Sequence, residues 1–455
     1  MPKKLPPIPI IGSINFRKTL SVPHLLKKIG AIFERVPDHR TGKIEHSLKD
    51  VLMSGLAMFG LKSGSMLAFD QGRADPHLSH NIQQLYGVET VPCDTQMRTV
   101  LDPVEPKTLR PATVAVVQEL QKQGILESYR FLGGYLVSVD GTGMFSSGKI
   151  SCPHCCEKHH KNGEITYHHQ LLASVIVHPD KPTVLPLFHE PITRQDGETK
   201  NDCEHNASKR LIPALKKGFP RLKMIMLQDA LACNGPHINL LKEHDFSFII
   251  TAKPAVNSLI LKSVLKGQSD GSGKTQEFER TDEKTGIIKG YRYANDVPLN
   301  STHKDLLVNF IDYWEVRPNG KEYTYACVTD LPITADNVDK IVCAGRSRWK
   351  VENETFNTLK NQGYCLEHNY GHGKQYLATT LALLMMLAFT VDQVQELCCS
   401  VFKAARNRFH SRKMLWQKMR GLFENHFIKD WYALYAALIW GFEGTVLETK
   451  FDDTS

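Results

Sequence analysis

Two apolar runs of strand length, each followed by an aspartate, constrain the fold of this chain more than any other feature. Residues 135–139 directly precede Asp140. Residues 224–227 are separated from Asp229 by one residue, Gln228. Short apolar runs of this kind, rich in β-branched and other apolar residues, predict buried β-strands. We therefore expect both carboxylates at the carboxyl ends of strands, although an aspartate at this position can also be a turn residue or a helix N-cap.

A third acid, Glu352, lies in the segment GRSRWKVENETFNTLK (residues 345–360), which is predicted to be helical. At 100° per residue, Glu352 falls on an apolar stripe with Trp349, Phe356, Leu359 and Gly363. A carboxylate on such a face needs a partner or a metal. Glu354 lies about 200° further round and is expected to be solvated. The three acids together predict a site for two Mg²⁺ ions that cuts phosphodiester bonds.

These acids, with Arg348 one turn before Glu352, resemble the motif of DDE transposases of the insertion-sequence-four family over about residues 130–390. Arg348 and Glu352 keep the family's interval, and the separations of the acids also suit it. Two positions depart from the pattern. Gly345 stands where the family has a tyrosine, and Lys360 lies one residue further from Glu352 than expected.

The resemblance implies an α/β fold, with a ribonuclease-H-like core, a β-rich insertion and helical regions at both ends. Residues 1–130 would form a helical N-terminal region with DNA-binding potential, and residues 131–253 the first part of the catalytic core. Residues 254–340 would form the insertion. Residues 341–395 would be core helices carrying Glu352, and residues 396–455 a basic helical C-terminal region.

The implied function is a transposase that cuts the ends of its own insertion sequence and joins the 3′-hydroxyl to target DNA. Asp140, Asp229 and Glu352 would hold Mg²⁺ or Mn²⁺, while Arg348 and Lys360 would contact phosphates. The partners would be the terminal inverted repeats, target DNA and a second copy of the chain in a synaptic homodimer. Two alternatives remain: a ribonuclease-H-like nuclease without strand transfer, and a non-catalytic DNA-binding relic of a transposase.

A fourth acid, Glu204, falls at helical spacing with Ala207, Leu211 and Leu215 in a helix predicted from about residue 202. Ribonuclease-H-like nucleases often carry an auxiliary metal-binding glutamate on this helix, so the resemblance makes Glu204 a candidate ligand. A capping or salt-bridging role explains the residue equally well.

Basic residues favour a polyanionic partner. The formal charge is +8, and residues 401–427 hold a basic run with Arg412 and Lys413 as candidate DNA contacts. Two short helices joined at Gly87, the second with Asp94 as N-cap, resemble a helix-turn-helix that would present Gln96 and Arg98 to DNA. A solvated helix face and packing without DNA contact are the alternatives.

The segment SCPHCCEKHHKNGEITYHHQ (residues 151–170) contains a candidate zinc site. Cys152 and Cys155 have the two-residue gap that lets both thiolates reach one ion. His159 or His160, and then His168 or His169, would complete a tetrahedron, with Cys152, Cys155, His159 and His169 as the preferred set. Such a site would be structural and would hold a β-hairpin; the alternative is an unliganded loop with reduced thiols.

Other classes of protein are not favoured. The N-terminal apolar stretch is short and broken by prolines, which predicts no secretory signal and a cytoplasmic, nucleoid-associated protein. Residues 377–391 form the longest apolar stretch, too short for a comfortable membrane span, so a buried helix is expected. The segment GQSDGSGKT imitates a P-loop, but its first glycine is misplaced and no apolar helix follows. The eleven cysteines are expected to be reduced thiols or metal ligands.

Overall fold

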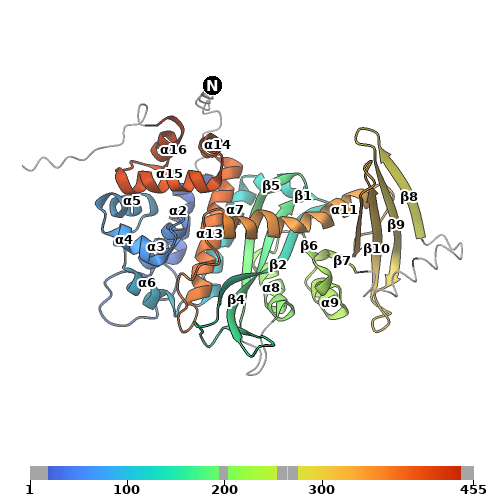
Figure 1. Cartoon of the computed structure of the whole chain (residues 1–455), viewed down its shortest axis with the longest axis horizontal. Helices are drawn as coiled ribbons and strands as arrows, with labels where there is room; N and C mark the ends of the chain where they lie inside the picture. The colour runs from blue at the N-terminus through green and yellow to red at the C-terminus, as the bar shows by residue number, and fades with distance from the viewer. Residues whose placement is uncertain (1–18, 194–202, 254–263, 265–274, 442–455) are drawn as a thin grey trace, which may run out of the picture.

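The computed structural model describes residues 19–193, 203–253, 264 and 275–441. The molecule is elongated, with a helical region at one end, a sheet through the middle and a further group of strands at the other end (Figure 1). The structure is therefore of the predicted α/β class, with one mixed sheet and many helices.

The strands described in the structure form one eleven-stranded sheet with the order β3-β4-β2-β6-β7-β11-β10-β9-β8, in which β5 also pairs with β4 and β1 with β2. Strands β2, β6 and β7 are parallel neighbours, and the other pairs are antiparallel. The strands are β1 (Arg130–Phe131), β2 (Gly134–Ser147), β3 (Cys156–His159), β4 (Ile165–His178), β5 (Lys181–Ile192), β6 (Met224–Gln228), β7 (Ser247–Thr251), β8 (Thr275–Asp282), β9 (Ile287–Pro298), β10 (Leu307–Val316) and β11 (Glu322–Thr329).

The parallel strands at the centre are buried on both faces, as their continuous apolar sequence predicts. All five residues of β6 are buried. Helix α8 (Glu204–Gly218) precedes β6, and its predicted apolar face of Ala207, Leu211 and Leu215 is fully buried. The 3-10 turn η3 (Ala230–Ala232) and helix α9 (Gly235–Glu243) connect β6 to β7.

The segment predicted to be a β-rich insertion contributes strands that are continuous with the core sheet. Strands β8 to β11 form an antiparallel meander, and β11 pairs with β7 through Cys327 and Thr251. The insertion therefore lengthens the central sheet at its β7 side. The P-loop-like segment, except for Thr275, lies outside the described residues.

Helices from the two ends of the chain pack into one helical region rather than two. Helix α13 packs on α3 and also on β5, while α15 packs on α5. The helices are α2 (Val22–Phe33), α3 (Leu48–Gly60), α4 (Met66–Arg73), α5 (Pro76–Tyr86), α6 (Asp94–Leu101), α7 (Arg110–Lys122), α13 (Leu377–Cys398), α14 (Ser400–Arg408), α15 (Arg412–Asn425) and α16 (Trp431–Trp440), with 3-10 turns η1 (Pro106–Leu109) and η2 (Ile125–Tyr129).

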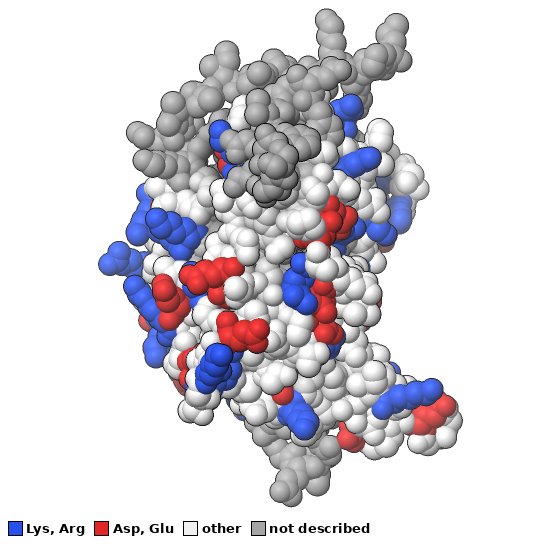
Figure 2. Space-filling view, turned by 90° about the vertical axis from the view of Figure 1, so that its left-hand side faces the viewer, with Lys and Arg blue, Asp and Glu red and all other residues white. Residues whose placement is uncertain are grey.

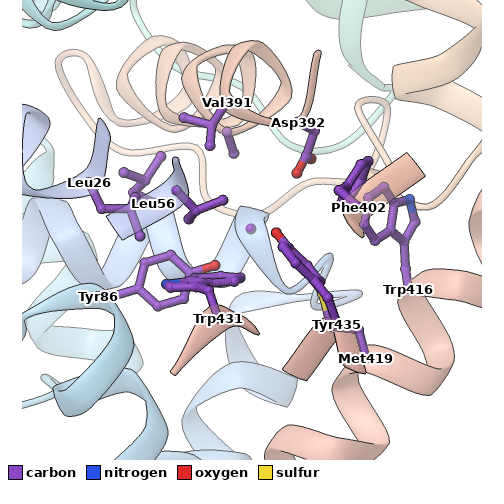
Figure 3. Close-up of a pocket in the computed structure, with 13 residues that line it drawn as sticks. Leu26, Leu56, Tyr86, Val391, Asp392, Phe402, Trp416, Met419, Trp431 and Tyr435 are labelled. Atoms are coloured by element: carbon purple, nitrogen blue, oxygen red, sulfur yellow. The ribbon is translucent and has the colours of Figure 1, made fainter. Parts of the chain in front are cut away.

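The interior of the helical region is shared by both chain ends. Tyr86 and Leu56 from the N-terminal side face Trp431 and Tyr435 from the C-terminal side around a cavity of about 20 Å³ (Figure 3). Asp392 of α13 lines the same cavity and forms an ion pair with the buried Lys62. This ion pair links α13 to the residues that follow α3.

The predicted buried helix over residues 377–391 is confirmed as α13, which continues to Cys398. Among the described helices, α13 is the one whose length and composition would suffice to cross a membrane. In its most apolar window 83% of the residues are buried inside the protein, as is usual for a core helix.

Candidate active site and metal centre

Asp140 and Asp229 lie side by side at one end of the parallel strand pair. The ladder between β2 and β6 ends at the pair Ser138 and Leu227, and each aspartate lies two residues beyond it. Neighbouring strands are about 4.8 Å apart, so the two carboxylates leave adjacent strands at the same level. The expectation that Asp140 lies at the carboxyl end of its strand is wrong, because antiparallel pairing with β4 carries β2 on to Ser147.

Asp229 also has the capping role that its sequence context allows. Its Oδ1 accepts a hydrogen bond from the backbone N–H of Leu231, 3.0 Å away, at the start of η3. The residue is only partly buried. A capping bond at one oxygen is compatible with metal binding, since a carboxylate has about four acceptor sites.

Glu352 is not on a regular α-helix. Helix α11 (Val338–Arg346) is followed by the 3-10 turn η4 (Ser347–Trp349), the π-helix η5 (Val351–Phe356) and α12 (Asn357–Asn361). The predicted stripe therefore fails at Trp349, whose exposed fraction is 54%, because a count of 100° per residue holds only in an α-helix. Glu354 is partly buried rather than solvated. Single π-turns of this kind are frequent at functional sites.

Two anchors hold the Glu352 segment against the sheet. The hydroxyl of Ser138 in β2 donates to the backbone oxygen of Arg348 over 2.9 Å. The ammonium group of Lys350 donates to the carbonyl oxygens of His178, Pro179 and Lys181 at the turn between β4 and β5. The segment is thus fixed both to β2, which carries Asp140, and to the turn that follows the neighbouring strand β4.

Arg348 connects the strand acid to the helical acid. Its Nη1 donates to Asp140 Oδ2 over 2.9 Å and to Glu352 Oε1 over 3.1 Å, and the residue is 7% exposed. This contact places Arg348 and Glu352 on the same side of the segment. The guanidinium lies between the two carboxylates rather than at the surface.

Glu204 approaches Asp140 from the opposite face of the sheet. Side chains alternate along β2, so Ser138 points towards Arg348 and Gly141 points the other way. A Cβ atom at Gly141 would lie 2.3 Å from Glu204 Oε1, so the absence of a side chain there makes room for this carboxylate. Burial raises the pKa of Glu204, and the charges of Asp140 and Asp229 raise it further.

The site carries an excess of negative charge. Burial raises the pKa of Asp140 to about 6, the hydrogen-bonding contact with Glu352 adds to the rise, and Arg348 opposes it. The one guanidinium contacts Asp140 and Glu352, whereas Asp229 and Glu204 line the neighbouring pocket. Carboxylate oxygens are the preferred ligands of Mg²⁺ and Mn²⁺, and crowded carboxylates with raised pKa values fit such a cation.

A pocket of about 310 Å³ opens beside Asp229 and Glu204. Gln170 of β4 and His205 of α8 also line it, together with His237, whose Nε2 lies 2.7 Å from Gln228 Oε1. Sequence reasoning did not single out Gln170, His205 or His237, because no spacing rule connects these three segments. The pocket gives Asp229 and Glu204 open space, whereas Asp140, Glu352 and Arg348 do not line it.

Side-chain packing explains why position 345 is a glycine and not the tyrosine of the resembled family. A Cβ atom at this position would lie 2.0 Å from the hydroxyl oxygen of Tyr325 in β11. Tyr325 belongs to the meander that extends the sheet, and burial raises the pKa of its hydroxyl. A tyrosine at position 345 would therefore collide with the tyrosine that the insertion supplies.

Most of the basic candidates are engaged within the fold. Arg412 forms a bidentate pair with Glu396 at 2.9 and 2.7 Å, and Lys360 pairs with Glu367 at 2.7 Å. Arg98 lies 3.7 Å from Asp94. Lys413 is exposed. On the helical end of the molecule acidic and basic side chains are interspersed rather than gathered into one basic patch (Figure 2).

The two short helices predicted around Gly87 are present as α5 and α6, and Gly87 has the left-handed conformation with φ of 66°. The N-cap of α6 is Cys93 rather than Asp94. Gln96 accepts a hydrogen bond from the Cys93 N–H and donates to Glu45, so its amide is used to hold α6 in place.

A separate group of metal-ligand type is formed by Cys152, Cys155, His169 and His372, whose donor atoms all lie within 4.8 Å of one another. The predicted ligand His159 is not part of it: its side chain is 68% exposed and contacts Glu157. The fourth donor, His372, comes from the loop between α12 and α13. Sequence reasoning missed it because 217 residues separate it from Cys155. The eleven cysteines all lie within the described residues, and none of them forms a disulfide there.

Comparison with protein-family models gives no match, and no curated protein matches this chain. A cryo-EM structure of the piggyBac transposase synaptic complex with hairpin DNA aligns with 93% of this chain and 80% of that chain. The sequence identity is 13% and the TM-score is 0.39. A TM-score of 0.39 is too low to assign a fold or a function from this similarity.

Proposed function

We propose that this protein is a DDE transposase that cuts the ends of its own insertion sequence and joins the 3′-hydroxyl to target DNA. The observation that carries the proposal is the convergence of Asp140 and Glu352 on Arg348, with Asp229 on the neighbouring strand and Glu204 in electrostatic reach. The mixed sheet with helical segments on both faces of β2 supports a ribonuclease-H-like core. DNA and a second copy of the chain are the proposed partners.

Mg²⁺ or Mn²⁺ bound by Asp140, Asp229 and Glu352 would activate a water molecule and stabilise the leaving 3′-oxygen. Asp140 must lose its proton to serve as a ligand, which its raised pKa of about 6 allows at neutral pH. Arg348 neutralises part of the carboxylate charge, and it would exchange these contacts for a DNA phosphate once cations are bound. Glu204 is proposed as the auxiliary acid.

The Cys/His cluster is proposed to have no part in this chemistry. Two thiolates with two imidazoles suit zinc, whereas carboxylates suit Mg²⁺ or Mn²⁺. The protein would therefore use two kinds of metal at two separate places.

The test is a cleavage and joining assay with full-length protein and DNA that carries the element's ends. Cleavage that requires Mg²⁺ or Mn²⁺, followed by joining of the 3′-ends to a second DNA, is the expected result. Asp140→Ala and Asp229→Ala should abolish cleavage and preserve end binding. Cleavage without joining would favour the nuclease, and binding without cleavage would favour the non-catalytic relic.

A further inference from the structure

The four donor atoms of the Cys/His cluster have the spacing of a tetrahedral metal site. The two sulfur atoms of Cys152 and Cys155 are 3.8 Å apart. Cys152 Sγ lies 3.4 Å from His169 Nε2, and Cys155 Sγ lies 3.1 Å from His372 Nε2. An ion bound to two sulfurs at about 2.3 Å in tetrahedral geometry separates them by about 3.8 Å. A disulfide requires about 2.05 Å, so these cysteines are not oxidised to one.

We propose that Cys152, Cys155, His169 and His372 bind one structural zinc ion, and that this ion cross-links the strand hairpin to the loop before α13. Two cysteines and two histidines form a closed tetrahedral set with no open position, which is typical of structural zinc. Cys155 and His169 are each 2% exposed, so the ion would be shielded from solvent.

The polar contacts that the two imidazole rings make within the described residues are confined to this site. The Nδ1 atoms of His169 and His372 are buried and make no hydrogen bond within the part of the chain that the structure describes. Each Nε2 faces a cysteine sulfur. Removal of the ion should therefore release both rings rather than only one.

The loop that carries His372 is bound on its other side by helix α6. The carboxylate of Asp102, at the end of α6, accepts hydrogen bonds from the backbone N–H groups of Lys374, Gln375 and Leu377 at 2.9, 2.9 and 3.1 Å. A Cβ atom at Gly373 would lie 2.2 Å from Asp102 Oδ1, so the loop and the carboxylate are in close contact.

A zinc ion here would join the hairpin region to the loop, and Asp102 joins the same loop to the N-terminal helices. Cys152, Cys155 and His169 belong to the hairpin region of the sheet, His372 belongs to the loop, and Asp102 fastens the loop to the N-terminal helices. The ring of His372 also contacts Phe145 of β2, with 4.9 Å between centroids. The ion would fix the helical region against the end of the sheet, whatever reaction the carboxylates perform.

Metal analysis of the full-length protein tests the ligand set. Protein purified without added metal should contain about one zinc per chain, and His372→Ala or Cys152→Ser should reduce the content to a small fraction. His159→Ala is the matched control and should keep the full content. His372→Cys should retain zinc, which separates loss of a ligand from failure to fold. Zinc-free wild-type protein, full zinc in His372→Ala, or no zinc in His372→Cys would overturn the proposal.

Hydrogen exchange tests the cross-link. Removal of zinc with a chelator should increase amide exchange in residues 363–376 at least tenfold and leave β10 and β11 unchanged. Unchanged exchange in the loop would overturn the cross-link. Neither measurement uses DNA cleavage, so failure here is distinct from failure of the proposed transposase activity.

Discussion

Replacement of Asp140 by asparagine should stabilise the metal-free protein at neutral pH while it removes a metal ligand. The pKa of Asp140 rises from 3.8 to about 6, chiefly through burial. At 1.36 kcal/mol per pH unit this rise corresponds to roughly 3 kcal/mol of unfavourable free energy for the ionised form. Asparagine avoids this cost but gives up one of the hydrogen bonds accepted from Gly141 N–H and Arg348, worth about 1 kcal/mol. The net gain is about 2 kcal/mol.

The gain should depend on pH in a defined direction. Asp140 binds its proton more tightly in the folded state than in the unfolded state. The free energy of unfolding therefore falls as the pH rises from 3.8 through about 6, because the folded protein must then hold an ionised, buried carboxylate. The advantage of Asp140→Asn is therefore full above pH 6 and shrinks towards pH 4.

Thermal unfolding in chelator at pH 7.5 and pH 4.5 measures this effect. Asp140→Asn should have the higher Tm at pH 7.5, with a smaller gap at pH 4.5. Asp336→Asn, at an exposed position, is the control and should have no pH-dependent gap. A lower Tm for Asp140→Asn than for the wild type at pH 7.5, or a difference in Tm that is the same at both pH values, would refute this prediction.

Three further outcomes are expected. Glu352→Gln should eliminate strand cleavage and weaken metal binding, whereas Glu354→Gln should leave most activity; the reverse would make Glu354 the third ligand. The rate of cleavage should fall as pH drops below about 6, because Asp140 then takes up a proton and can no longer serve as a ligand; a flat profile down to pH 5 would contradict this. Arg412→Ala should lower stability by about 1–3 kcal/mol through loss of its partly buried pair, while Lys413→Ala should leave Tm unchanged and weaken DNA binding. Equal Tm values for these two variants would argue against a structural role for Arg412.

The position of Asp229 after its strand and that of Glu204 on its helix could be predicted because they follow from local periodicity, whereas the continuation of β2 beyond Asp140 could not. A short apolar run places the β6 strand, and helical spacing places Glu204 on the face of α8 that meets the sheet. The geometry around Glu352 could not be predicted in this way. The η4 turn and the π-helix change the angle per residue, so Trp349 turns outwards although the count places it inwards.

Contacts between segments far apart in the sequence were beyond prediction for a different reason. His372 lies beside the two cysteines only because of the tertiary fold. His159, which is much closer to them in the sequence, has a spacing that is usual for a zinc ligand but is not part of the cluster. The continuation of the sheet from β7 to β11 and the union of both chain ends in one helical region are likewise packing results. Local sequence patterns contain no information on such pairs.

Manganese binding tests the central claim most directly, because it needs no knowledge of the element's ends. Full-length protein should be titrated with Mn²⁺ and the free ion followed by electron paramagnetic resonance. We expect saturable binding, which Asp229→Asn and Glu352→Gln should each weaken at least tenfold and Glu354→Gln should leave unchanged. Binding of equal strength in all four proteins would contradict a metal site at Asp140, Asp229 and Glu352.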